Sequence, residues 1–159
     1  MTEPIVPLAS LETAPMLALN QAHKAETSDL TAPVFDHLVA TAFYARGIAP
    51  AEAFLIAFDE TADYGSPNFH YFRERYPSFA YIDRIITAAH ARGKGYARRL
   101  YEDMFDLARA AGKPMVCCEV NADPPNPGSD AFHARLGFTV VGTASLDNGK
   151  TVRYLIKPL

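Results

Sequence analysis

The stretch "ARGKGYARRLYEDMFDLARAAGKP", residues 91–114, places two glycines one residue apart directly before a helical pattern. The pattern covers residues 95–111, and its apolar residues form one stripe at helical spacing: Leu100, Met104, Leu107, Ala108 and Ala111. Gly112, followed by Lys113 and Pro114, is a strong helix stop. Because glycine is a poor helix former, Gly93 and Gly95 indicate either a loop or a backbone that something must approach closely.

The start of this helix has the properties of a phosphate cradle. The first N–H groups of a helix lack internal partners, and the helix dipole adds partial positive charge there. Glycine leaves the backbone open to a bulky anion, and Arg92 and Lys94 add charge beside it. The Walker spacing is absent, and Arg98 stands where the dinucleotide motif needs its third glycine. On this stretch alone, a flexible basic turn is the simpler alternative.

Working outward, strands and helices alternate along the chain. We expect strands at 15–23, 52–58, 79–88, 115–120, 138–144 and 151–157, and helices at 29–47, 95–111 and 127–136. Residues 64–78 look irregular, with one helical turn after Asn68, and the prolines of 121–127 predict a loop. Asn148-Gly149 is a hairpin signal. The expected fold class is therefore a mixed α/β sheet, α+β in character, in a single domain over residues 1–159.

A second motif, "NPGSDAFHARLGF", covers residues 126–138. Pro127 is well placed as the first residue of a helix, with Asn126 as its cap, and Ser129 and His133 then stand one turn apart on one face. With this motif, the chain resembles the GNAT superfamily of N-acetyltransferases. Residues 92–97 match its R/Q-x-x-G-x-G/A loop, and residues 126–138 match its N-x-x-[AS]-x-x-x-[YH]-x-x-x-G-F element. The chain also resembles a bacterial group of that superfamily with the signatures YIDRI and PPNPxSxxFHxxLGF.

The resemblance implies a mostly antiparallel sheet that splays open between its fourth and fifth strands, here 79–88 and 114–120. It also implies acetyl-CoA as cosubstrate and an unidentified amine as acceptor, either a small molecule or a protein N-terminus. The backbone of the loop would hold the diphosphate, and the fourth strand would pair with the pantetheine arm. The helix that begins at Pro127 would face the cofactor. The cofactor-binding residues implied are Ile85, Ile86, Thr87, Arg92, Gly93, Lys94, Gly95, Tyr96, Ala97, Asn126, Ser129 and His133.

Three side chains are candidates for the chemistry. Glu119 is the first choice for general base, because the branch of the superfamily that acetylates protein N-termini has Glu at the matching strand position. Asp83 is the second choice, since alternation places it on one face of its strand with Tyr81 and Ile85. The structural alternative for Glu119 is an ion pair with Arg or Lys or a solvated strand end, and for Asp83 it is an ion pair that holds the sheet or loop. His133 stands where many members have a Tyr acid; acid, base, cofactor contact and buried structural imidazole all stay open for it.

The charge, the cysteine content and the apolar segments of the whole chain argue against several other classes of protein. Its net charge of −3 argues against a nucleic-acid backbone as the main partner. The sequence shows neither a signal peptide nor a membrane span, so we expect a cytoplasmic protein. The adjacent Cys117 and Cys118 fit neither a disulfide framework nor a metal site. A non-catalytic acyl-CoA-binding or regulatory module is the main alternative function, and a nucleotide-phosphate binder is another. The oligomeric state is open, including a homodimer, since strand edges and helix faces in this fold often dimerise.

Overall fold

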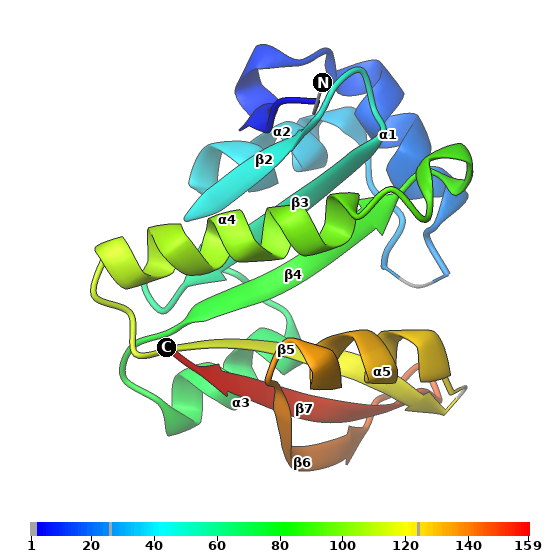
Figure 1. The fold of residues 1–159 in the computed structure, drawn as a ribbon. Helices are drawn as coiled ribbons and strands as arrows, with labels where there is room; N and C mark the ends of the chain where they lie inside the picture. The colour runs from blue at the N-terminus through cyan, green and yellow to red at the C-terminus, as the bar shows by residue number, and fades with distance from the viewer. Residues whose placement is uncertain (1–2, 26, 124) are drawn as a thin grey trace.

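Seven strands and five helices make up the described part of the chain, residues 3–25, 27–123 and 125–159 of a computed structural model (Figure 1). The strands are β1 (Val6–Pro7), β2 (Tyr44–Ile48), β3 (Ala53–Asp59), β4 (Ala80–Thr87), β5 (Met115–Asp123), β6 (Thr139–Ser145) and β7 (Thr151–Pro158). The helices are α1 (Thr13–Ala22), α2 (Ala32–Thr41), α3 (Pro67–Arg75), α4 (Tyr96–Ala110) and α5 (Pro127–Arg135). Short 3-10 turns lie at Leu8–Ser10 and Ala89–Ala91.

The strands form one mixed sheet in the order β1-β2-β3-β4-β5-β7-β6. Every neighbouring pair is antiparallel except β4 and β5, which run parallel. Their pairing is limited to Ala80 with Val116 and Tyr81 with Cys117. Beyond these two pairs the strands diverge, and β5, β7 and β6 form a separate lower wing in Figure 1. The expected α/β fold with a splay between the fourth and fifth strands is thus confirmed.

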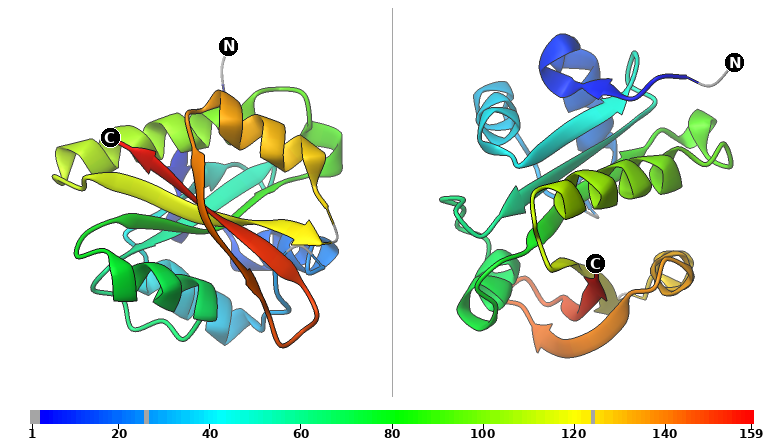
Figure 2. Two further views of the ribbon diagram at one scale, coloured as in Figure 1. Left: turned by 90° about the horizontal axis from the view of Figure 1, so that it is seen from below. Right: turned by 60° about the vertical axis from the view of Figure 1, so that its left-hand side comes forward.

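Helices cover both faces of the sheet (Figure 2). Helices α4 and α5 lie on one face, and α2 and α3 lie on the other. Three residues of the stripe expected on α4 enter the core, since Leu100, Met104 and Ala108 are fully buried; Leu107 is half-buried, and Ala111, the C-cap residue, is exposed. Burying these apolar side chains stabilises the position of α4 across β3 and β4. The N-terminus of α4 is thereby fixed near the end of β4, where the sheet opens.

The strand expected at 15–23 is wrong, because residues 15–22 lie within helix α1 and His23 is its C-cap residue. Met16, Leu19 and Asn20 are its buried residues, and this is helical spacing rather than alternation. Pro15 stands in the first turn, where a proline removes no helical hydrogen bond. The short apolar run in the sequence is compatible with either a strand or a helix. In the structure, the buried polar residue of α1, Asn20, accepts a hydrogen bond from Arg84 of β4.

Three other boundaries differ from expectation. The helix expected over 29–47 ends at Thr41, and Gly47 lies in β2 rather than stopping a helix. A Cβ on Gly47 would lie 2.6 Å from the carbonyl oxygen of Ala53, so the β2–β3 pairing requires glycine there. The irregular stretch at 64–78 contains the nine-residue helix α3. Strand β5 continues into the expected loop to Asp123, while Pro124 of that loop lies outside the described residues.

The expected helix caps and the expected hairpin turn are confirmed. The Thr31 side chain caps α2 by accepting from the Val34 N–H, and Asn126 caps α5 by accepting from the Ser129 N–H. Gly149 has a φ of 83° in the turn between β6 and β7. Cys117 and Cys118 are both buried and free. A search of the described residues finds no helix with the length and apolar character that a membrane span needs.

Candidate functional site

A cavity of about 220 Å³ lies where β4 and β5 diverge. Residues 82–85 of β4 form one wall, and residues 118–121 of β5 form the other. Helix α5 adds Ser129 and His133, and the β6–β7 turn adds Lys150. The splay therefore creates a site between the facing edges of two strands that no longer pair with each other at this level.

The glycine loop lies at the same end of β4, between the 3-10 turn Ala89–Ala91 and α4. Gly93 and Gly95 have φ values of 81° and 77°, and Gly95 is the N-cap residue of α4. The left-handed backbone region favours glycine strongly, so the local conformation explains both residues. A Cβ at either position would meet no atom within 4 Å, so the space above the loop is open. Residues 92–95 are all exposed.

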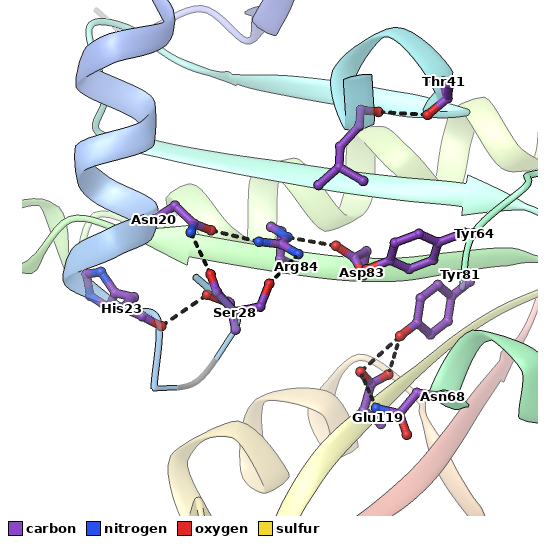
Figure 3. A network of polar contacts seen from close by, with 12 residues as sticks. Asn20, His23, Ser28, Thr41, Tyr64, Asn68, Tyr81, Asp83, Arg84 and Glu119 are labelled. Atoms are coloured by element: carbon purple, nitrogen blue, oxygen red, sulfur yellow. Dashed lines mark hydrogen bonds and ion pairs between the residues drawn. The ribbon is translucent and has the colours of Figure 1, made fainter. Parts of the chain in front are cut away.

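Glu119 on β5 projects into the cavity from the wall that faces β4 (Figure 3). The Tyr81 hydroxyl lies 2.9 Å from its Oε1 and 2.8 Å from its Oε2. The Asn68 amide nitrogen donates to Oε1 at 3.1 Å. These donors come from β4 and α3, so the carboxyl group is held between the two halves of the sheet.

The surroundings of Glu119 change its acidity. Burial, together with the nearby Asp83 charge, raises the pKa of this carboxyl to about 8, although the Tyr81 and Asn68 donors act in the opposite direction. Apolar surroundings penalise the charged form, whereas hydrogen-bond donors favour it. A carboxyl group that titrates near neutral pH beside a cavity has the properties of a general base. A salt bridge to Glu119, the structural alternative, is absent among the described residues.

Asp83, by contrast, is held in a buried ion pair. Its Oδ2 accepts from Arg84 Nε at 2.7 Å, and its Oδ1 accepts from the Tyr64 hydroxyl at 2.5 Å. The two side chains of the pair are 5% and 4% exposed. Asp83 also occupies an irregularity in the β3–β4 pairing, since Arg84 pairs with Ile56 and Ile82 with Ala57. With both oxygens occupied, the arrangement matches the ion-pair alternative and leaves Asp83 the weaker candidate for base.

The Arg84 guanidinium extends this network to the N-terminal helices (Figure 3). It donates to Asn20 Oδ1 at 2.8 Å and to Ser28 Oγ at 3.1 Å. The Asn20 amide nitrogen in turn donates to the Ser28 carbonyl oxygen at 2.8 Å. The network thereby attaches α1 and the segment after it to the strand that lines the cavity.

His133 on α5 is 5% exposed, and both of its ring nitrogens have partners. Nδ1 lies 2.8 Å from the Ser129 carbonyl oxygen, and Nε2 lies 2.8 Å from the Tyr101 hydroxyl. Since a carbonyl can only accept, we assign the proton to Nδ1, and Nε2 accepts from Tyr101. Burial lowers the pKa of His133, which favours the neutral imidazole. This geometry is that of the structural imidazole; an acid role for His133 stays a prediction.

The remaining sequence-based candidates divide into two groups. Ile85 lines the cavity, whereas Ile86 is buried and pairs with Phe54 of β3, and Thr87 pairs with Ala53. Asn126 lies on the cavity wall in addition to capping α5. The loop residues 92–97 do not line this cavity; they connect the 3-10 turn after β4 to α4, whose Tyr101 does line it. The cavity and the loop are thus two adjoining parts of the candidate site.

Sequence reasoning missed several residues that contact Glu119, Asn68 or His133. Asn68 and Tyr154 are linked, because the Tyr154 hydroxyl donates to Asn68 Oδ1 at 2.9 Å. Tyr101 reaches His133 from α4, 32 positions away. Of these, only Tyr81 had a signal, since alternation placed it on the same face as Asp83. The others reach the site through tertiary packing, which no local pattern encodes.

Comparison with known proteins identifies a family. Residues 19–138 match the acetyltransferase (GNAT) family. No curated protein matches the chain in sequence. Solved structures with the same fold include Ard1 from Thermoplasma volcanium, at 14% identity and a TM-score of 0.74, covering 100% of this chain and 99% of that one. The ribosomal-protein-S18-alanine N-acetyltransferase from Escherichia coli follows at 17% identity and 0.69, covering 99% and 94%. A NatC complex bound to Gag peptide and CoA has 16% identity and 0.74, covering 100% and 99%.

Proposed function

Since this chain belongs to the GNAT family of acetyltransferases, we propose that it transfers an acetyl group from acetyl-CoA to an amine. The observation that carries the proposal is the position of Glu119 inside the cavity where β4 and β5 diverge, with a pKa of about 8. A carboxyl group with this acidity can accept a proton from an amine near neutral pH. The acceptor, a small molecule or a protein N-terminus, would enter from the side of Glu119 and the β6–β7 turn.

The residues of the loop fit the diphosphate of acetyl-CoA. The open space above Gly93 and Gly95 admits a bulky group, and the N-terminus of α4 directs unpaired N–H groups and partial positive charge toward it. Arg92 and Lys94 are exposed beside the two glycines and add two positive charges. Past Tyr81, the edge of β4 that faces away from β3 no longer pairs with β5. The backbone groups of this edge can therefore pair with an extended chain by strand addition.

The proposed reaction moves one proton and one acyl group. A neutral amine nitrogen forms a bond to the thioester carbonyl carbon, and the carbon–sulfur bond then breaks. The nitrogen loses one proton and the sulfur gains one, so the products are an amide and a free thiol. Glu119 would accept the proton from nitrogen, which prevents expulsion of the amine in place of the thiolate. Tyr81 and Asn68 would keep the carboxylate oriented during this step.

Thiol release with a panel of amines tests the proposal. The panel includes small amines and peptides with free N-termini, because two similar structures are an S18-alanine N-acetyltransferase and a complex with Gag peptide. We expect at least one amine to release thiol from acetyl-CoA in a protein-dependent way. Binding of coenzyme A without any acceptor-dependent thiol release would instead support a non-catalytic acyl-CoA-binding module.

The pH dependence of kcat/KM provides a second test. Glu119 is neutral below its pKa and becomes a base only above it, so activity should rise with pH through an apparent pKa near 8. Below that value we expect a slope of about tenfold per pH unit. The acceptor should be an arylamine that is neutral from pH 6 to 9, so that its own titration does not contribute. A flat profile over this range would exclude Glu119 as the titrating base.

Gly95→Ala should weaken acetyl-CoA binding by about tenfold, because strain of about 1–2 kcal/mol at a φ of 77° would displace the start of α4. The matched control is Gly112→Ala, which introduces the same strain at the other end of α4, where φ is also 77°. Both variants should lower the unfolding temperature, but only Gly95→Ala should change the Kd measured by calorimetry. Equal Kd values for the two variants would contradict the role of the loop.

A further inference from the structure

We propose that Tyr154 is a positioning residue that holds the Asn68 side chain with its amide nitrogen toward Glu119. The inference rests on the proposed function in one respect, namely that Glu119 is the base of the reaction. The effect of Tyr154 on the protonation of Glu119 can be measured without any turnover.

The geometry is a chain of two hydrogen bonds across three elements. The Tyr154 hydroxyl of β7 donates to Asn68 Oδ1 at 2.9 Å, and Asn68 Nδ2 of α3 donates to Glu119 Oε1 at 3.1 Å. A primary amide has donors on one side and an acceptor on the other. Because the amide oxygen of Asn68 accepts from the Tyr154 hydroxyl, the amide nitrogen of Asn68 faces the Glu119 carboxylate. The reverse orientation would place the amide oxygen against an ionised Glu119, so that two acceptors would face each other.

The Tyr154 ring is itself held in place. It is buried and stacks on Tyr71 of α3, with ring centroids 3.8 Å apart and an angle of 12° between the planes. The Arg75 guanidinium lies 3.7 Å from the Tyr71 ring centroid on the same stack. Gly142 of β6 makes room for this arrangement, since a Cβ there would overlap the Tyr71 hydroxyl. The fixed ring gives the Tyr154 hydroxyl a fixed direction toward Asn68.

The orientation of Asn68 affects how tightly Glu119 binds its proton. With the nitrogen inward, the amide stabilises the carboxylate and opposes the effect of burial. With the oxygen inward, it would accept from the protonated carboxyl group and add to the effect of burial. Other titratable or charged groups around Glu119 come from the elements packed on it: Tyr81, Asp83 and Arg84 on β4, Cys118 on β5, Tyr154 on β7, Tyr101 on α4, His133 on α5, Arg75 on α3 and Lys150 in the β6–β7 turn. Removing only the Tyr154 hydroxyl leaves the chemical identity of every other group in this set unchanged.

The test is a titration of the Glu119 carboxyl carbon by ¹³C NMR, with Glu119→Gln used to assign the resonance. Tyr154→Phe keeps the stacked ring and removes the hydroxyl, so we expect the Glu119 pKa to rise by about half a unit to one unit. Asn68→Leu removes the inward donor and should raise the pKa at least as much. Tyr71→Phe is the matched control, because it removes a hydroxyl from the same stack without touching Asn68; its Glu119 pKa should stay at the wild-type value.

An unchanged Glu119 pKa in Tyr154→Phe would overturn the inference, and so would an equal shift in Tyr71→Phe. If Tyr154→Phe does not fold, Asn68→Leu decides, since an unchanged pKa there would show that the amide does not act on Glu119. When an acceptor is known, the inflection in kcat/KM should move by the same amount as the NMR titration. A protein without acetyltransferase activity would still give the NMR result, so the two proposals fail separately.

Discussion

Replacing Glu119 with glutamine lowers kcat/KM for amine acetylation by about 10²- to 10⁴-fold at pH 8. Glutamine keeps the length of the side chain and can still accept from the Tyr81 hydroxyl, but it cannot take a proton from the amine. The rate is measured as acceptor-dependent thiol release at several pH values. The inflection near pH 8 should disappear together with the rate, because it belongs to the group that has been removed.

The control for this variant is Glu102→Gln, an exposed carboxylate on α4 that pairs with Arg98. It carries the same change of charge and should leave kcat/KM within about twofold, since exposed pairs contribute little. Acetyl-CoA should still bind to Glu119→Gln, because the substitution leaves the loop intact and glutamine keeps the shape of the side chain in the cavity. If Glu119→Gln retains most of its activity at pH 8, another group is the base.

Replacing Arg84 with methionine destabilises the fold by about 3–5 kcal/mol. The substitution leaves the Asp83 carboxylate buried without its cation, and it also removes the donors to Asn20 and Ser28. A loss of this size is a large part of the stability of an ordinary domain. It is measured as a change in the free energy of unfolding by urea, with the slope of the transition checked for constancy.

Two further variants isolate the cause of that loss. Arg84→Met combined with Asp83→Asn should recover part of the stability, because the unpaired charge is gone. Arg98→Met, which removes an exposed guanidinium paired with Glu102 on α4, should change stability by less than about 0.5 kcal/mol. If the double variant is no more stable than Arg84→Met, the buried charge does not account for the loss.

The sequence predicted those parts of the fold that local chemistry determines. Gly93 and Gly95 have the positive φ values expected of a glycine loop, and α4 begins at Tyr96, within one residue of the expected start at 95. Asn126 caps α5 because its side chain and the Ser129 N–H are close in sequence. Segment 15–23 was wrongly predicted as a strand, since its short apolar run fits either element and its helix packs against α2.

The candidate site was predictable only in part. Glu119 was identified from its place on the fifth strand, but its donors Tyr81 and Asn68 lie 38 and 51 positions away. The acidity of Glu119 depends on those distant groups and on burial, neither of which the strand sequence contains. Asp83 was considered a base because alternation was assumed. Alternation predicts neither the irregularity in the β3–β4 pairing at Asp83 nor the ion pair that its carboxylate forms with Arg84.

Titration calorimetry with acetyl-CoA tests the central claim most directly, namely that the loop at residues 92–97 and the adjoining cavity bind this cosubstrate. We predict one site per chain with a Kd between about 1 µM and 1 mM, the usual range for enzyme substrates, and a weaker Kd for Gly95→Ala. ATP, which has the phosphates but no pantetheine arm, should bind more weakly. The absence of heat with acetyl-CoA at millimolar concentration would contradict the account.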